Sequence, residues 1–168
     1  MKPIAKKATP AALAVLRQAT ALKPNRKKAS DGLLPSAAHI KQSPASDHNT
    51  GLAADLTHDP GNGIDCREIF EKLKEDKRVS YLIFEGKIWS KEKSKLGNRR
   101  YTGSNPHNKH LHISINASSA ADTSPWFWWM NQPKLINQVK AAVAAVPTKK
   151  AYPVEDTSKC CQHCPSKK

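Results

Sequence analysis

The segment 110–115, with the sequence HLHISI, alternates strictly between polar and apolar residues. A period of two predicts a β-strand with one buried face, because successive side chains of a strand point to opposite sides of the sheet. The apolar residues of the segment then belong to the core, and His110, His112 and Ser114 project from the other face. The chain is therefore expected to build a sheet that carries two imidazoles on its open face.

A second segment repeats this arrangement around a carboxylate. Residues 52–57 (LAADLT) predict a strand on which Asp55 faces away from the leucines, and His48 lies in the loop before it. Two histidines and one carboxylate on neighbouring strands form the ligand set of a catalytic zinc site, which leaves a fourth position open. An H-x-H pattern alone is a weak signal, because most isolated histidine pairs lie on the surface. Two separate strand motifs together favour a metal site.

The remaining pattern predicts an α+β fold, in which a small antiparallel sheet is flanked by helices. The other expected elements are a helix that begins at Thr9-Pro10 and ends before Pro24, a helix that begins at Asp65, a hairpin over 79–90 and a last helix over 132–146. Residues 24–50 and 91–108 are expected to be irregular. The predicted organisation is a basic tail over 1–8, one domain over 9–146 and a disordered Lys- and Cys-rich tail over 147–168.

The net charge of +14 is concentrated at the two ends of the chain. Residues 1–30 hold eight basic and no acidic residues, and residues 127–168 hold seven basic and two acidic ones. The middle, over 31–126, is nearly balanced, which argues against a specific nucleic-acid interface. Basic ends favour a polyanion such as an anionic cell-wall polymer, or act only as solvated tails. Nucleic-acid binding through the termini is a weaker alternative that predicts steep salt dependence.

No apolar run approaches the ~20 residues of a membrane span. The N-terminus imitates a signal peptide, but Arg17 interrupts its apolar stretch after about six residues, fewer than the ~7–15 of such signals. We therefore expect a helix there, no signal peptide, synthesis in the cytoplasm and a monomer.

Two motifs resemble a known family. Residues 46–55 (SDHNTGLAAD) resemble the S-x-H-x-x-G-x-A-x-D motif of the zinc D-Ala-D-Ala carboxypeptidase superfamily. Residues 107–112 resemble the H-x-x-H-x-H motif of its murein endopeptidase branch. The superfamily includes lysostaphin-type enzymes and the zinc fold of hedgehog proteins. The likeness covers about residues 9–130, and the wider stretch is similar to small bacteriophage peptidases, including endolysins.

The resemblance implies a hedgehog/D,D-peptidase-like fold and a zinc-dependent peptidase that cleaves stem or cross-link peptides of bacterial peptidoglycan. Such an enzyme would reach the wall through a holin-type pore or from a virion. The implied zinc ligands are His48, Asp55 and His112; the implied catalytic residues are His110 and His107; the expected substrate-binding residues are Ser46, Arg100 and Tyr101.

One position departs from the family pattern. Three residues before the last ligand, where the carboxypeptidase and dipeptidase branches place a glutamate base, this chain has Lys109, which cannot accept a proton while charged. The departure favours the endopeptidase branch with His110 as the base, and it leaves the cleaved bond open. It also keeps an alternative: a non-catalytic zinc-containing protein that binds cell wall or peptide on the same fold.

Other residues carry simpler expectations. Gly51 is expected to let the chain pass close to the metal. Arg26 is interpreted as a solvated surface charge and Asp31 as a turn residue. Trp126 is expected to close the domain after the last strand, and Cys66 is expected to be buried.

Overall fold

The computed structural model describes residues 4–130 of the 168-residue chain. The helix expected over 132–146 and the tail expected over 147–168 lie outside the described residues. Within the described part, no helix is both long and apolar enough to cross a membrane.

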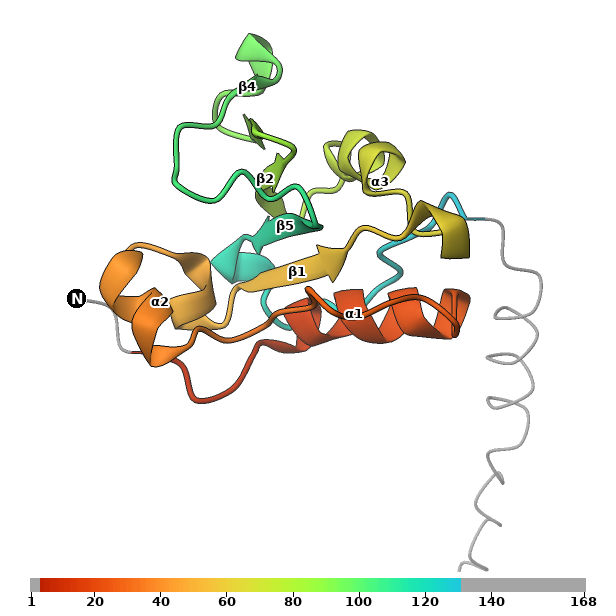
Figure 1. The fold of residues 1–168 in the computed structure, drawn as a ribbon, viewed down its shortest axis with the longest axis horizontal. Coiled ribbons are helices and arrows are strands. Elements are labelled where there is room, and N and C mark those ends of the chain that lie inside the picture. Colours follow the sequence, from red (N-terminus) through yellow and green to blue (C-terminus); the bar gives the residue numbers. More distant parts are fainter. Residues whose placement is uncertain (1–3, 131–168) are drawn as a thin grey trace, which may run out of the picture. The chain divides into compact units, whose positions relative to one another are not determined.

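The described part is an α+β fold built on one antiparallel sheet with the strand order β1-β5-β2-β3-β4 (Figure 1). Its strands are β1 (Ala53–Thr57), β2 (Val79–Phe84), β3 (Lys87–Ser90), β4 (Arg99–Arg100) and β5 (His110–Ile115). The first and last of these are the two strands predicted from alternation, and they pair with each other. The predicted small antiparallel sheet is confirmed.

The helices begin where their capping residues predict. Helix α1 (Pro10–Leu22) follows Thr9, whose side chain accepts a hydrogen bond from the backbone N–H of Ala12. Helix α3 (Cys66–Leu73) follows Asp65, which caps it in the same way. Helix α2 (Ala37–Gln42) lies in the stretch expected to be irregular, as does the 3₁₀ helix η1 (Asp47–Thr50). A sequence of six helical residues with no buried position gives no periodic signal, which is why α2 was missed.

The core lies between one face of the sheet and helices α1 and α3 (Figure 1). Alternate residues of the strands enter it, among them Leu56 on β1, Leu82 on β2 and Leu111 on β5, all fully buried. Helix α1 contributes mostly alanines, so it packs close to β1. The opposite face of the central strands is left for polar side chains, as the alternation requires.

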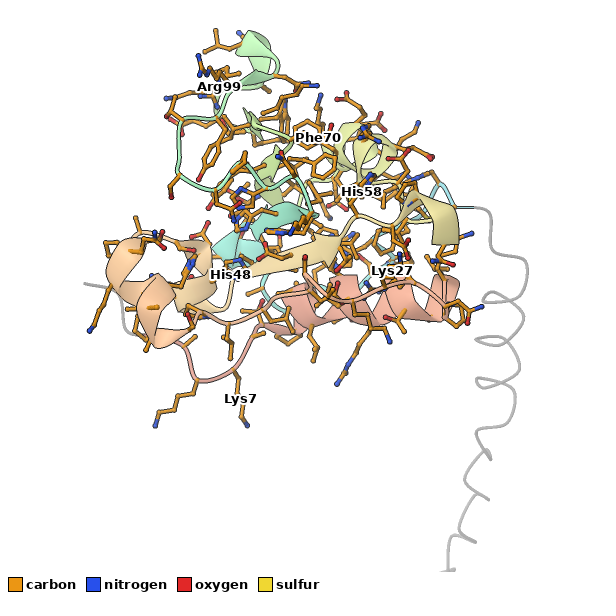
Figure 2. All side chains as sticks on the ribbon, in the orientation of Figure 1. Lys7, Lys27, His48, His58, Phe70 and Arg99 are labelled. Carbon is orange, nitrogen blue, oxygen red and sulfur yellow. The ribbon has the colours of Figure 1, made fainter. Side chains whose placement is uncertain are left out.

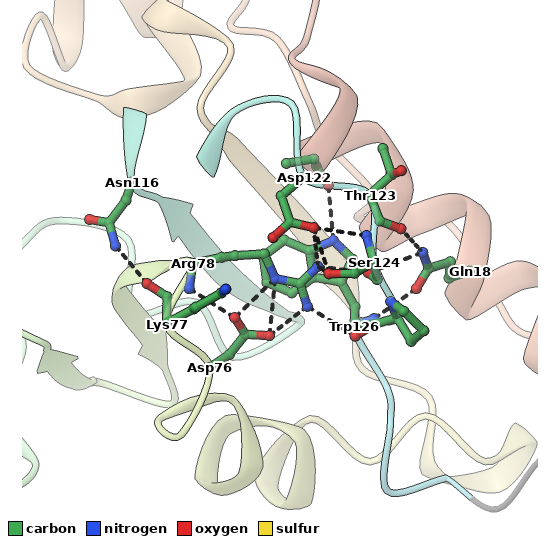
Figure 3. A network of polar contacts seen from close by, with 11 residues as sticks. Gln18, Asp76, Lys77, Arg78, Asn116, Asp122, Thr123, Ser124 and Trp126 are labelled. Atoms are coloured by element: carbon green, nitrogen blue, oxygen red, sulfur yellow. Dashed lines mark hydrogen bonds and ion pairs between the residues drawn. The ribbon is translucent and has the colours of Figure 1, made fainter. Parts of the chain in front are cut away.

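Arg78 ties the segment that follows β5 to the rest of the domain (Figure 3). Its buried guanidinium forms an ion pair with Asp76 at 2.6 Å and donates hydrogen bonds to the carbonyl oxygens of Ser124 and Pro125. It also stacks over Trp126 at 3.8 Å from the ring centroid. Trp126 is fully buried and its indole N–H donates to the carbonyl of Ala11, so this residue closes the domain as predicted.

The prediction for Arg26 is wrong. Its side chain is buried and holds the Asp31 carboxylate with two nitrogens, at 2.9 and 2.6 Å. Asp31 in turn accepts hydrogen bonds from the backbone N–H and the hydroxyl of Thr57. The pair therefore anchors the loop before α2 to the end of β1. Sequence gave no sign of it, because both partners lie in a polar stretch without periodicity.

Candidate metal centre

Three side chains converge on the open face of the sheet: His48 from η1, Asp55 from β1 and His112 from β5. One ligand atom from each can be chosen so that all three lie within 4.8 Å of one another. The Asp55 Oδ1 atom lies 3.2 Å from His48 Nε2 and 3.0 Å from His112 Nδ1. Figure 2 labels His48, which lies beside α2 near the start of β1. Both histidines are buried, so the cluster is held inside the protein surface.

His48 is oriented by the backbone behind it. Its Nδ1 atom lies 3.0 Å from the carbonyl oxygen of Leu33. When Nδ1 carries the proton and donates it there, the lone pair of Nε2 points at the cluster. Metal-binding histidines use this arrangement, because the second hydrogen bond fixes the tautomer and the ring.

Asp55 is supported by Gly32, a contact that sequence analysis missed. The two residues exchange backbone hydrogen bonds of 3.1 and 2.8 Å across the free edge of β1. A Cβ atom at position 32 would lie 3.0 Å from Asp55 Oδ2. A side chain at position 32 would therefore push the carboxylate from its place by a few tenths of an ångström. The S-D-G sequence suggested only a turn, and nothing local reveals that it pairs with a strand.

Gly51 has a different role from the one expected. It ends η1 in the left-handed conformation, with φ of 71°, and a Cβ atom there would lie 2.7 Å from the carbonyl oxygen of Lys7. The close approach that glycine permits is thus with the N-terminal segment and not with the metal site. Thr9 reinforces it by donating its backbone N–H and its hydroxyl to the Gly51 carbonyl.

The three residues of the cluster influence one another electrostatically. Burial disfavours the charged form of both His48 and Asp55, but their hydrogen bond and mutual attraction outweigh it. The net result is a raised pKa for His48 and a pKa for Asp55 well below its usual range, with His112 contributing to the latter. Asp55 is therefore ionised, and its Oδ1 atom lies between the two imidazole rings. The negative charge of Asp55 favours a cation at this position.

His107 and His110 lie beside the three ligands, as the motif implies. His110 Nε2 is 3.6 Å from Asp55 Oδ2, and the His107 ring centroid is 4.9 Å from that of His110. Burial, followed by the neighbouring histidines, lowers the pKa of His107 to about 4. Burial also lowers the pKa of His110, against the attraction of Asp55. Both rings are thus kept neutral near pH 7, with a lone pair available.

His107 adopts an unusual backbone conformation, with φ of 58°. A non-glycine residue in the left-handed region is uncommon, and such strain often accompanies functional positions. The side chain of Asn105 accepts the His107 backbone N–H at 3.0 Å and so supports the turn. The conformation places the ring in edge contact with both His110 and His112.

A cavity of about 430 Å³ opens over the ligands. Its lining comprises His39, Gln42, Ser43, Pro44, Ala45, Ser46, His48, Asp55, Tyr81, Ile83, Tyr101, Ser104, Asn105, His107, His110 and His112. Of the three residues expected to bind substrate, the structure brings Ser46 and Tyr101 to this cavity. Arg100 is not part of the lining; it lies on β4, opposite Lys87 of β3.

Tyr81 is a second site residue that sequence analysis missed. It lies on β2 directly opposite Ser114 of β5, and its ring stacks on that of His112 at 5.4 Å. The hydroxyl of Ser114 donates to Asp47, the residue that precedes the ligand His48. The strand pattern of residues 79–84 could have suggested that Tyr81 shares a face with the histidines, had the order β5-β2 been known.

The donor set fits zinc. Two imidazole nitrogens and one carboxylate oxygen are typical zinc ligands, and three protein ligands are the number that a catalytic zinc site uses. Among residues 4–130, no second group of three His, Cys, Asp or Glu side chains brings its ligand atoms this close together.

Comparison with protein families gives a match over most of the described chain. The family described as VldE, C-terminal domain, matches residues 5–112, which is more than half of the chain. The match ends at His112 and so includes all three residues of the cluster. No curated protein and no solved structure is significantly similar to the chain.

Proposed function

The chain belongs to the VldE C-terminal domain family, and from its candidate metal centre and its sequence motifs we propose that it is a zinc-dependent peptidase acting on the stem or cross-link peptides of bacterial peptidoglycan. The observation that carries the proposal is the convergence of His48, Asp55 and His112 beneath an open cavity, with two neutral histidines beside them. The resemblance of residues 46–55 and 107–112 to the two peptidase motifs supports the choice of substrate. The proposed fold type is that of hedgehog and D,D-peptidase domains.

Zinc would be held by His48, Asp55 and His112. When bound, it supplies a Lewis acid that lowers the pKa of water and polarises a carbonyl group. The remaining work falls to side chains of this chain. Leu33 and Gly32 hold two of the ligands in place through their backbone groups.

His110 is the proposed base. Its lowered pKa leaves the ring neutral near pH 7, and its position 3.6 Å from Asp55 Oδ2 stabilises the imidazolium after it accepts a proton. It can then return that proton to the leaving amine. His107 contacts the same ring and keeps it oriented, so we assign it a supporting role.

The lining of the metal cavity is suited to a peptide substrate. Ser46 and Tyr101 offer hydroxyl groups along its wall, and no lysine or arginine lies in its lining. Tyr101 stands in edge contact with His107, so it borders the place where His110 would act. An anionic cell-wall polymer remains a proposed second partner of the basic ends of the chain.

A binding protein that retains zinc without hydrolysis is the second candidate. Lys109 supports it, because the usual carboxylate base is missing from that position. The two candidates differ in a single measurable property, the turnover of peptide bonds.

The test is a digest of purified peptidoglycan by zinc-loaded protein, with and without a zinc chelator, followed by mass spectrometry of the released fragments. New peptide termini that disappear with chelator are the expected result, and their masses name the bond. If the zinc-loaded protein releases no fragment from any wall type, the peptidase proposal is overturned and the binding protein is favoured.

A further inference from the structure

A second cavity, of about 500 Å³, adjoins the metal cavity. Both cavities share Asp55, Asn105 and His110 in their lining. A substrate held at His110 can therefore extend into either of them. The second cavity is bordered by the start of β5 and by the loop that carries Gly32.

Of the three charged residues that line the second cavity, two already have a partner or a role. Asp31 is already neutralised by the two-nitrogen contact with Arg26. Asp55 belongs to the metal cluster. Lys109 is the remaining charged residue of the lining, and it makes no ion pair with any residue in the described range 4–130.

The neutral groups nearby are hydrogen-bond donors. Asn105 uses its carbonyl oxygen to accept the His107 N–H, which leaves its amide N–H groups free to donate. Asn108 and Ser30 add a further amide and a hydroxyl. An ammonium group together with amide and hydroxyl donors is suited to a carboxylate, because hydrogen bonds to a charged acceptor are about twice as strong as neutral ones.

The backbone of Lys109 is held next to His110, whereas its side chain is exposed. Its backbone carbonyl accepts the N–H of His58 at 2.9 Å, which anchors it beside the end of β1 and directly before His110. The metal cavity, by contrast, has no lysine or arginine in its lining. A substrate carboxylate close to the cleaved bond can therefore be neutralised by a basic side chain only if it lies in the second cavity, where Lys109 is.

We propose that the second cavity is a carboxylate subsite in which Lys109 binds an acidic group of the substrate. The inference rests on the proposed peptidase function for the identity of the ligand. The carboxylate has two possible sources. A terminal carboxylate would make the enzyme a carboxypeptidase, whereas an acidic side chain would direct it to an internal bond of an acidic peptide.

Binding of short peptides to the full-length, metal-free chain tests the subsite without any need for turnover. Three probes separate the sources: acetyl-Ala-D-Ala as the free acid, the same peptide as its terminal amide, and acetyl-Glu-D-Ala-amide. Calorimetric titration should show that at least one carboxylate probe binds about tenfold more tightly than the neutral amide. Which of the two binds more tightly identifies the source.

Variants then assign the effect to the residue. Lys109→Gln should remove the preference for the carboxylate, and Lys109→Arg should retain it. Lys72→Gln, which removes an exposed lysine of α3, should change nothing. The subsite is disproved if the natural chain binds acid and amide equally, binds neither, or keeps its preference in Lys109→Gln. Because no cleavage is measured, these outcomes are distinct from a failed peptidoglycan digest.

Discussion

Asp55 and His112 lie directly opposite each other on β1 and β5, with the carboxylate Oδ1 3.0 Å from Nδ1 of the imidazole. Opposite residues of an antiparallel pair have Cβ atoms about 4.5–5.5 Å apart, so strand pairing by itself brings these two ligands together. A shift of register by one residue would turn one of them toward the core. The sheet register thus brings together two of the three residues of the candidate metal centre, and the third, His48, comes from η1.

Substitution of His110 and of His112, one at a time, should separate zinc binding from peptide cleavage. His112→Ala removes a ligand and should abolish stoichiometric zinc content, measured by mass spectrometry of the metal. His110→Ala should keep the zinc and lose cleavage by about 10²–10⁴-fold, the usual contribution of a general base. Full zinc content in His112→Ala, or full activity in His110→Ala, would show that the roles are misassigned.

Gly32→Ala should weaken metal binding without unfolding the protein. The added Cβ would lie 3.0 Å from Asp55 Oδ2, so the carboxylate must move. Loss of support behind a ligand typically lowers metal affinity by about 10–100-fold. Gly61→Ala is the matched control, since a Cβ atom there meets nothing within 4 Å. Equal zinc affinity in the two variants, measured by competition with a chelating dye, contradicts the proposed support.

The stability of the metal-free protein should fall as pH decreases from about 6.5 to about 4. His107 has a folded pKa of about 4, whereas an unfolded histidine titrates near 6.5. In this window the unfolded chain binds a proton that the folded chain does not, so acid favours unfolding. His110 and His39, whose pKa values are also lowered by burial, act in the same direction.

His107→Asn tests this origin of the pH dependence. Urea unfolding at several pH values should show a shallower slope between pH 6.5 and 4 in the variant. His48 has a raised pKa, so its contribution is complete below about 6.5 and is lost only at higher pH. An unchanged slope in His107→Asn would mean that His107 is protonated in the folded state over this range.

Arg78→Ala should be strongly destabilising. The substitution leaves Asp76 buried without its partner, and removal of one member of a buried ion pair typically costs about 3–5 kcal/mol of unfolding free energy. It also removes the donors to the Ser124 and Pro125 carbonyls. Arg67→Ala breaks an exposed pair with Glu85 and should have a much smaller effect. Similar urea midpoints for the two variants would contradict this ranking.

Alternation along the chain was sufficient to predict the strands that carry Asp55, His110 and His112. In β5 and β1 the apolar residues fill one face, so the position of His110, His112 and Asp55 on the other face follows from the period of two. Capping residues likewise located the first turns of α1 and α3. These are local signals, each contained within a few residues.

The parts that could not be predicted depend on contacts between distant residues. Gly32 supports Asp55 only because its loop adds to the edge of β1, and Tyr81 stacks on His112 only because β2 lies next to β5. Arg26 is buried and paired with Asp31, although the sequence suggested a solvated charge for Arg26 and only a turn residue for Asp31. His39 reaches the metal cavity from a helix that itself gave no periodic signal.

The pairing of Asp55 with His112 also decides when the site can exist. The two residues are 57 positions apart in the chain, and the pair forms only after a loop of that length has closed. The unfolded chain therefore offers no comparable three-ligand site, and its separate histidines and cysteines bind a metal ion more weakly than the assembled site. Free zinc at 100 times its dissociation constant would then add about 2.7 kcal/mol to the unfolding free energy. The melting temperature of this protein should accordingly rise with zinc concentration, so that the supply of zinc sets the thermal stability of the fold.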